Sequence, residues 1–306
     1  MSNTRIYWLH ALSPTHAGIG RGVGYIDLPI DRDGITGWPI IRGSGFKGVW
    51  ADYYTQKEAE RDREKNSLLR AAFGVAGNDN NSNAGALIPT DAKLVCLPVR
   101  SFRGTFAWCT SPLCLQTLRR TLELAGVNAL PEPPGAVNDG DAHHAPGTAL
   151  VEGKQIFLED LDFSASENAI AERWAVKIGK WVFPNDTAWQ EQFTKRFVIL
   201  PDLAFDFLCE TGTEVHTRVK ISDESKVVEK GALWTEESVP SETIFSGIVQ
   251  CERVFHGNGQ KAATSTPDHL LQHFASATIP LQIGGKATVG RGQMRCVFTP
   301  VNGDVQ

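Results

Sequence analysis

The chain has 306 residues, of which 42% are hydrophobic and 21% are charged. These values are ordinary for a protein that buries a core, so a mostly disordered chain is excluded, and one large or two modest domains are allowed. The 30 Lys and Arg residues against 35 Asp and Glu residues give a net charge of -5. That total argues against a protein that coats nucleic acid through bulk positive charge, although it does not show where the charges lie.

No stretch of the sequence predicts a membrane span or an export signal. The apolar run near the N-terminus is short and is interrupted by His10, so a cytoplasmic protein is expected. The cysteines form no CxxC pair, and we expect them to be small buried hydrophobic residues rather than zinc ligands. They stand at positions 96, 109, 114, 209, 251 and 296.

The order of predicted elements favours an α+β fold. Three helices have start signals, at Ser44, at Ser111-Pro112 and at Thr266-Pro267, and apolar residues follow each at helical spacing. Strands and helices alternate without a regular βαβ rhythm, so a doubly wound parallel sheet is disfavoured. The strand-like runs are 6–12, 92–99, 196–200, 214–221, 243–249 and 292–298.

Two segments predict irregular structure. The stretch 74–86 is small and polar, and 126–147 is rich in Pro, Gly, Asn and Asp. The second contains His143 and His144, which we interpret as solvated side chains of a loop rather than metal ligands.

The stretch 16–47 carries the first candidate chemistry. Several glycines after His16 allow the backbone to approach a ligand closely, and the stretch then reaches Asp27 between apolar residues. A carboxylate on such a loop can serve as a general base or a metal ligand in phosphodiester chemistry. The alternative is that Asp27 caps a turn and His16 packs in the core.

The same stretch ends where glycines run into a helix. Arg42, Ser44 and Lys47 surround the predicted helix N-terminus, and free amides with two cations favour a phosphate there. The alternative is a helix cap with two solvated cations. A second basic, glycine-rich stretch, 281–295, predicts a hairpin whose loop presents amides and cations to a nucleic-acid backbone.

The stretch 217–247 predicts an extended hairpin. It contains Trp234 followed by an acidic pair, Glu236 and Glu237. An arm of this kind can insert between nucleotides and position a phosphate. The alternative is an edge hairpin whose charges discourage aggregation.

Four stretches together resemble a known family. These are SPTHAGIGRGVGYIDLPIDRDGITGWPIIRGSGFKGVWADYY, FGVAGNDNNSNAGALIPTDAKLVCLPVRS, KGALWTEESVPSETIFSGIV and IPLQIGGKATVGRGQMRCVF. In this order they are similar to the repeated backbone subunit of the Cmr effector complex, the type III-B CRISPR ribonucleoprotein, which belongs to the RAMP superfamily. The resemblance implies a single domain, 1–306, with a ferredoxin-like (RRM-like) palm, a loop insertion at 126–147 and an inserted thumb hairpin at about 214–245.

The resemblance also implies an endoribonuclease. Such subunits cleave paired target RNA at regular intervals, by attack of the RNA's own 2′-hydroxyl, in a reaction that needs a divalent metal such as Mg or Mn. The family's central Asp matches Asp27 in GYIDLPI, which is also the candidate metal-binding residue, and its His matches His16 in SPTHAG. The family's acidic residue in this hairpin matches Glu236. The aromatic residue expected beside it is absent, because Thr235 and Ser238 stand there.

The implied partners are guide RNA, complementary target RNA, further copies of the chain stacked helically and other Cmr-type subunits, with no membrane. Arg42, Ser44 and Lys47 are expected to bind guide-RNA phosphates, and Gly284, Gly285, Lys286 and Arg291 are expected to complete the same cradle. Other functions remain open, namely a noncatalytic guide-RNA scaffold, a type III-A-like RAMP backbone subunit and a guide-processing RAMP endonuclease.

Overall fold

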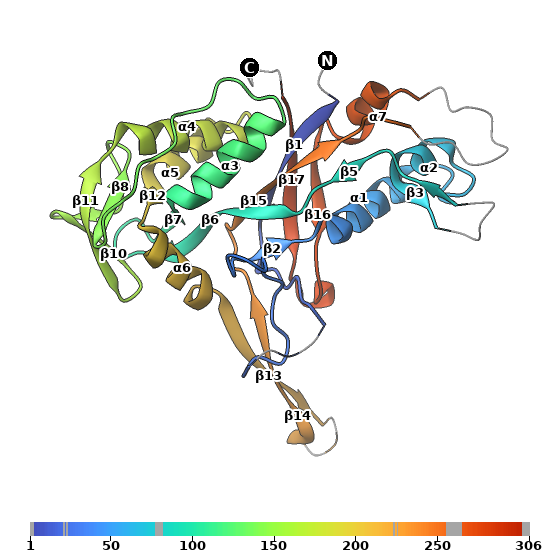
Figure 1. The fold of residues 1–306 in the computed structure, drawn as a ribbon. Coiled ribbons are helices and arrows are strands. Elements are labelled where there is room, and N and C mark those ends of the chain that lie inside the picture. Colours follow the sequence, from blue (N-terminus) through green and yellow to red (C-terminus); the bar gives the residue numbers. More distant parts are fainter. Residues whose placement is uncertain are drawn as a thin grey trace.

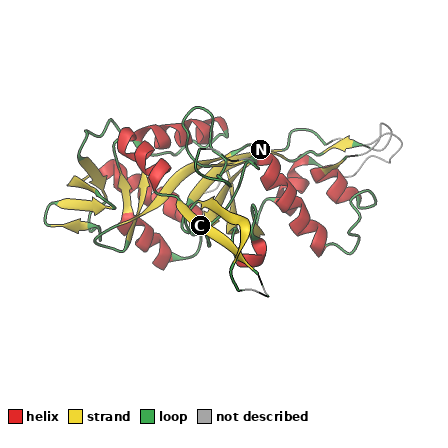
Figure 2. Ribbon diagram, turned by 90° about the horizontal axis from the view of Figure 1, so that it is seen from below, coloured by secondary structure: helices red, strands yellow, loops and turns green. Residues whose placement is uncertain are grey.

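The computed structural model describes residues 3–20, 22, 24–76, 82–222, 224, 226–254 and 265–301. A large mixed sheet runs through the molecule, with helices packed on both of its faces (Figures 1 and 2). This arrangement confirms the predicted α+β class.

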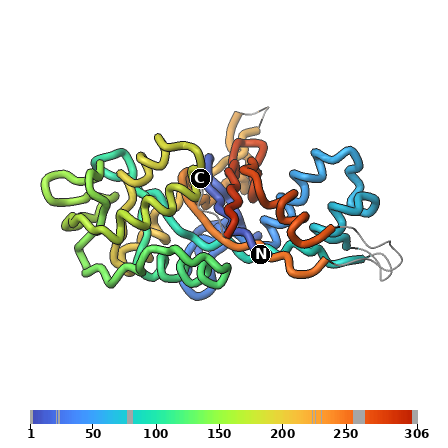
Figure 3. The backbone as a smooth tube through the Cα atoms, turned by 90° about the horizontal axis from the view of Figure 1, so that it is seen from above, coloured from blue at the N-terminus to red at the C-terminus, as the bar shows by residue number. Residues whose placement is uncertain are grey.

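The centre of the sheet consists of four antiparallel strands in the order β17-β1-β15-β6. The first and last long strands of the chain therefore lie side by side, as the blue and red tubes in Figure 3 show. All four were predicted, within two residues at each end. They are β1 (Thr4–Ala11), β6 (Ala92–Arg100), β15 (Ile244–Gln250) and β17 (Gln293–Pro300).

Alternate residues of β1 enter two different cores. Tyr7 and Leu9 face one hydrophobic cluster, whereas Ile6 and Trp8 face the other. This follows from the period of two residues in a strand, and it explains why Ile6 to Leu9 form a continuous apolar run rather than alternating with polar residues. Each large side chain that is fully buried in this way contributes about 1.5–3 kcal/mol.

The three predicted helix starts are present, two of them with the predicted caps. Ser111 and Thr266 each accept a hydrogen bond from a backbone N–H of the first turn, and Pro follows each. The third helix, α1, begins one residue before Ser44, so Arg42 occupies its N-cap position and Ser44 is not the cap. The helices are α1 (Gly43–Lys57), α2 (Ser67–Phe73), α3 (Pro112–Leu124), α4 (Ala169–Val182), α5 (Thr187–Arg196), α6 (Asp202–Thr211) and α7 (Pro267–Phe274).

The helices divide between the two faces of the sheet. Phe46 and Trp50 lie on the apolar side of α1 and are fully buried. They pack with residues of α2 and α7 on one face of the sheet. The cluster on the other face draws on α3, α4 and α5. Burial on both faces accounts for the continuous apolar runs in the middle of the central strands, such as 6–9 in β1 and 94–99 in β6.

The sheet continues beyond β6 through shorter strands, and one of these corrects the sequence interpretation. Residues 141–144, expected to be irregular, form β8, which pairs with β11 and β12. His144 is buried with Nδ1 2.9 Å from the Ala145 carbonyl, so the expectation that both histidines are solvated is wrong. These strands are β7 (Phe106–Thr110), β8 (Asp141–His144), β9 (Val151–Glu152), β10 (Gln155–Leu158), β11 (Leu161–Glu167) and β12 (Phe197–Ile199).

A two-stranded hairpin projects from the body of the molecule (Figure 1). It pairs β13 (Glu214–Ile221) with β14 (Val228–Ser238), within the stretch for which a hairpin was predicted. The predicted C-terminal hairpin is also present, with β16 (Thr278–Gln282) joined to β17 through the 3₁₀ turn η1 (Ala287–Val289). The remaining short strands are β2 (Ile40–Ile41), β3 (Gly74–Val75), β4 (Asn83–Ala84) and β5 (Ile88–Pro89).

All six cysteines are buried and unpaired, which confirms their expected role as small hydrophobic residues. Burial raises the pKa of each thiol. Within the described part of the chain, no helix combines the length and the apolar character that crossing a membrane requires.

Candidate functional site

Asp27 is exposed, but its position is fixed by the base of the β13/β14 hairpin. Its Oδ2 accepts a hydrogen bond from the backbone N–H of Thr235 at 2.8 Å, and the Thr235 hydroxyl lies 3.0 Å from the same oxygen. The backbone N–H of Leu28 donates to the Thr235 carbonyl at 3.0 Å. Among the described residues, Oδ1 of Asp27 has no hydrogen-bond partner, so one oxygen is held by Thr235 while the other is available to a ligand.

His16 is buried where the two glycine-rich stretches meet. Its Nδ1 lies 2.7 Å from the carbonyl oxygen of Glu237, and its own carbonyl accepts a bond from the Gly285 N–H at 2.9 Å. A carbonyl oxygen can only accept, so Nδ1 carries the proton, and in the neutral ring Nε2 has the lone pair.

The glycines beside His16 are required because their backbone lies too close to His16 for a larger residue. A Cβ on Gly18 would lie 2.5 Å from His16 Nε2, and a Cβ on Gly284 would lie 2.2 Å from the His16 carbonyl oxygen. Gly284 also has a φ of 82°, in the left-handed region that glycine adopts without strain. The glycines therefore make room for the histidine.

A cavity of about 420 Å³ opens beside His16. The N-terminal end of α1 and the C-terminal glycine loop, which were expected to form one phosphate cradle, both line this cavity. Its wall includes Leu28 and Pro29 but, within the described residues, not Asp27 itself. The lining residues that were predicted to bind RNA are Arg42, Gly284 and Gly285.

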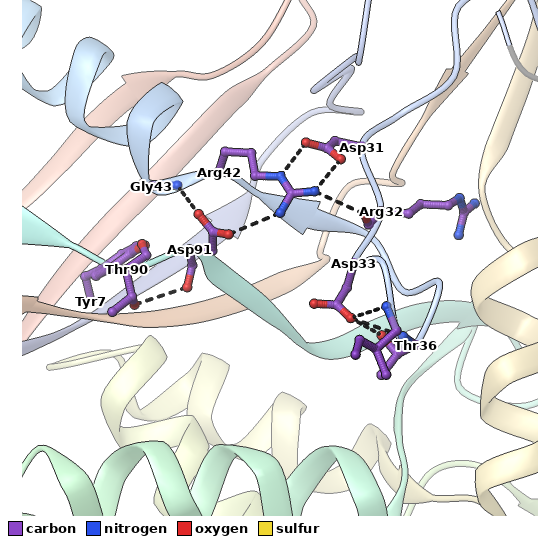
Figure 4. Close-up of polar contacts among 10 residues, drawn as sticks. Tyr7, Asp31, Arg32, Asp33, Thr36, Arg42, Gly43, Thr90 and Asp91 are labelled. Atoms are coloured by element: carbon purple, nitrogen blue, oxygen red, sulfur yellow. Dashed lines mark hydrogen bonds and ion pairs between the residues drawn. The ribbon is translucent and has the colours of Figure 1, made fainter.

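Arg42 is not a free cation. Its guanidinium makes two hydrogen bonds to Asp31, at 2.7 and 2.9 Å, and one to Asp91 at 3.2 Å (Figure 4). The other oxygen of Asp91 accepts from the Gly43 N–H at 2.7 Å. The hydrogen bonds to Asp31 raise the pKa of Arg42. The predicted anion site at the N-terminus of α1 therefore already holds a carboxylate of the protein itself.

Ser44 and Lys47 lie away from this network. They are three residues apart on α1 and so share one face of the helix, whereas Arg42 and Gly45 line the cavity. Ser44 is exposed and Lys47 is half-buried, and burial lowers the pKa of the Lys47 ammonium. No ion pair involves Lys47 in the part of the chain that the structure describes.

The cations of the C-terminal loop pair with the hairpin. Lys286 Nζ lies 2.8 Å from Glu236 Oε1, and Arg291 Nη1 lies 3.1 Å from Glu214 Oε2. Glu236 is 5% exposed and also accepts a bond from the Trp234 indole N–H at 2.8 Å. Burial alone raises the pKa of Glu236, but Lys286 and Trp234 outweigh it, and the pKa lies below its ordinary value.

Some functional contacts were not predicted from the sequence. Thr235 was noted only as a departure from the family pattern, yet it is the residue that holds Asp27. Asp31 and Asp91 were not assigned a role, and they neutralise Arg42. The sequence IDRD, at 30–33, places two aspartates shortly before the basic helix N-terminus, and this local pattern could have indicated such pairing.

The described residues contain no cluster of three or more His, Cys, Asp or Glu side chains with the geometry to hold a metal ion. A divalent ion at Asp27 would therefore need ligands from the RNA, as Mg²⁺ commonly takes phosphate oxygens together with one or two carboxylates. The residues that the structure describes do not by themselves supply a complete ligand set.

The family comparison agrees with this architecture. The RAMP superfamily matches residues 8–295, so the chain belongs to the RAMP superfamily.

Relatives narrow the family further. The chain is 32% identical over 297 residues to the CRISPR system Cmr endoribonuclease Cmr4 of Pyrococcus furiosus, which covers 96% of this chain and 95% of that protein. It is 25% identical to the CRISPR system CMR subunit Cmr4 of Saccharolobus solfataricus, over 94% of this chain and 93% of the relative. Within the superfamily, the chain therefore belongs to the Cmr4 family.

Solved structures show the same fold. The crystal structure of oligomeric Cmr4 from Pyrococcus furiosus matches with a TM-score of 0.72 and 27% identity, over 97% of both chains. A chain of the type III-B Cmr-beta complex bound to cognate target RNA matches with a TM-score of 0.71 at 19% identity, over 96% of both chains.

Proposed function

We propose that this chain is the repeated backbone subunit of a type III-B CRISPR effector complex, and that it cleaves target RNA paired with a guide RNA at regular intervals. The observation that carries the proposal is the similarity, over nearly the full length of both chains, to a protein named as the Cmr endoribonuclease. The exposed, hydrogen-bonded carboxylate of Asp27 supplies a residue suited to the chemistry.

The strand order supports a ferredoxin-like palm. Taken along the chain, the elements β1, α1, β6, β15, α7 and β17 give the βαββαβ sequence, and the order β17-β1-β15-β6 corresponds to strands 4-1-3-2. In this proposal the projecting β13/β14 hairpin is the thumb, and 1–306 is one domain with the segment 126–147 inserted.

Cleavage by the RNA's own 2′-hydroxyl needs little from the protein beyond a base, in-line geometry and charge relief. The 2′-oxygen loses its proton and bonds to the adjacent phosphorus, and the 5′-oxygen leaves and takes up a proton. Oδ1 of Asp27 is suited to accept the first proton, and His16, once protonated on Nε2, to donate the second. Glu236 is ionised and paired with Lys286, so its proposed role is to position this cation and the hairpin.

Guide-RNA phosphates are proposed to follow the cavity beside His16. Ser44 and Lys47 on α1 and the amide of Gly284 are the groups most open to phosphate, because the Gly285 N–H already donates to the His16 carbonyl. Arg42, Lys286 and Arg291 are paired with carboxylates, so in this proposal a phosphate competes with Asp31, Glu236 or Glu214 for each cation. Before RNA binds, these ion pairs fix the positions of the loops that carry Arg42, Lys286 and Arg291.

The proposed partners are guide RNA, complementary target RNA, further copies of the chain and other Cmr-type subunits. The oligomeric crystal form of Cmr4 from Pyrococcus furiosus supports stacking of copies. The near-full-length similarity to Cmr4 favours the type III-B assignment, because the match to Csm3 of Streptococcus thermophilus covers 26% of this chain. We place the assembly in the cytoplasm, where six unpaired cysteines are compatible with a reducing environment.

The decisive experiment replaces Asp27 by Asn in a complex reconstituted with guide RNA. Target RNA should bind with unchanged affinity and should be cut at least about a hundredfold more slowly. Asp162→Asn changes an exposed residue of β11. This variant is the matched control and should cut at the wild-type rate. Wild-type cutting by Asp27→Asn would instead support the noncatalytic scaffold.

Metal dependence is tested in the same assay. Chelation with EDTA should stop cleavage, and Mg²⁺ or Mn²⁺ should restore it, while guide-RNA binding persists. Cleavage at an undiminished rate in EDTA would leave Asp27 as a base that acts without metal.

A further inference from the structure

Glu237 is a buried carboxylate with three donors, two from the segment after Asp27 and one from Thr213 just before β13. Its side chain is 2% exposed. Oε2 accepts from the backbone N–H of Ile30 at 3.0 Å, and Oε1 accepts from Arg32 Nη2 at 2.6 Å and from the Thr213 hydroxyl at 2.9 Å. A buried carboxylate is costly unless it is paired and hydrogen-bonded, and here these conditions are met.

The backbone of Glu237 makes two further contacts. Its N–H donates to the Leu28 carbonyl at 2.9 Å, and its carbonyl accepts from His16 Nδ1 at 2.7 Å. Thr235, two residues earlier on the same strand, binds Asp27. One short length of β14 therefore contacts both residues of the proposed chemistry.

Glu236 and Glu237 have separate tasks because adjacent residues of a strand point to opposite faces. Glu236 pairs with Lys286 of the C-terminal loop, and Glu237 pairs with Arg32 of the segment after Asp27. That segment consists of turns and isolated bridges rather than a strand or helix, so its position depends on such contacts.

We propose that Glu237 is the positioning residue that holds the Asp27 segment against the hairpin base and sets the His16 ring relative to it. This inference rests on the proposed role of Asp27 in cleavage. Glu237 does not touch RNA in this proposal, and it acts through Ile30, Arg32 and the His16 contact. Correct placement within about 1 Å can change a rate by about a hundredfold.

The test uses Glu237→Gln in the reconstituted complex with guide RNA. Gln keeps the size and one acceptor oxygen but presents an amide N–H₂ or a neutral oxygen to Arg32. Under single-turnover conditions with saturating target RNA, the cleavage rate should fall by about tenfold or more, while target affinity stays within about twofold. Glu229→Gln, on the same strand but paired with Lys220 near the exposed end, is the matched control and should behave as wild type.

A double-mutant cycle separates positioning from general loss of structure. Arg32→Met alone should slow cleavage, and the Arg32→Met/Glu237→Gln double variant should be little slower than the slower single variant, because each substitution removes the shared Arg32–Glu237 contact. Wild-type cutting by a folded Glu237→Gln complex would overturn the inference. The inference would also be overturned if each single variant lost cleavage rate, target affinity and melting temperature together, and the double variant showed the combined losses of both.

Asp27→Asn in the same series distinguishes the two proposals. An inactive Asp27→Asn with an active Glu237→Gln refutes the positioning role and leaves the proposed function intact. An active Asp27→Asn refutes the proposed role of Asp27, and with it the positioning role that depends on it.

Discussion

Lys286 Nζ lies 2.8 Å from Glu236 Oε1, so the C-terminal glycine loop and the projecting hairpin are joined by an ion pair between a half-buried Lys and a buried Glu. Lys286 also lies over the Trp234 ring, at 5.7 Å from its centroid. Both residues were predicted to act on RNA independently. Their pairing means that each fixes the position of the other before RNA arrives.

This pair predicts a dependence of stability on pH. Burial raises the pKa of Glu236, but Lys286 and Trp234 outweigh burial and lower it below the ordinary 4.5. A carboxylate with a lowered folded-state pKa stabilises the protein fully above its unfolded pKa, and this stabilisation is lost as the pH falls through the folded value. Between about pH 6 and about pH 3, the unfolding free energy of the wild type should therefore fall more steeply than that of Glu236→Gln.

Chemical denaturation at several pH values measures this difference. Lys286→Met removes the cation instead of the carboxylate, and it should also flatten the acid limb of the profile. Equal slopes for all three proteins would show that the pair contributes nothing to acid stability.

Lys47 is predicted to contact phosphate. It is half-buried on α1, and no ion pair neutralises it among the described residues. Lys47→Met should weaken guide-RNA binding and reduce the slope of log affinity against log salt by about one, as loss of a single phosphate contact does. Lys57→Met, at the exposed far end of the same helix, is the control. Titrations at several salt concentrations measure both, and identical slopes would contradict a phosphate contact.

Arg42 is predicted to behave differently from Lys47 although both are cations near one helix end. The guanidinium group of Arg42 already pairs with Asp31 and Asp91. Arg42→Lys keeps the charge but cannot form the two parallel bonds to Asp31, so the unfolding free energy should fall by about 1 kcal/mol. Arg42→Met, which removes the charge, should leave the salt slope of RNA binding unchanged, because Asp31 and Asp91 already neutralise Arg42. A reduced slope with unchanged stability would show instead that Arg42 leaves the aspartates and binds phosphate.

The sequence predicted the regular elements better than the site contacts. The strands around Tyr7 and Leu94 and the helix carrying Phe46 follow from local periodicity and apolar content, which a single stretch of sequence contains. The strand at 141–144 could not be predicted in this way, because it is short and lies in a stretch rich in turn residues. It is a strand because it pairs with β11 and β12, which lie elsewhere in the sequence. Tertiary pairing there outweighs local composition.

The same distinction applies to the site. The glycines and His16 were found from composition, and the structure brings the two glycine-rich stretches together at His16. The partners of the cations were not found, because Asp91 lies 49 residues from Arg42, and Glu236 lies 50 residues from Lys286. A basic pattern therefore indicates where cations are, but only the fold shows which of them are already neutralised.

At Gly284, the cost of backbone strain can be separated from the cost of a steric clash with His16 by comparison with Gly290. Gly284 and Gly290 both have φ near 80°, at 82° and 78°. An added Cβ on Gly290 meets nothing within 4 Å, whereas on Gly284 it would lie 2.2 Å from the His16 carbonyl. Gly290→Ala should therefore cost about 1–2 kcal/mol from backbone strain alone, and Gly284→Ala about 2–4 kcal/mol.

The two variants should also differ in cleavage. Gly284→Ala displaces His16 and should slow cutting of target RNA, whereas Gly290→Ala should cut at close to the wild-type rate once folded. Urea unfolding measures the first difference, and single-turnover cleavage measures the second. Equal losses for both glycines would show that the backbone conformation, and not the contact with His16, is what requires glycine at position 284.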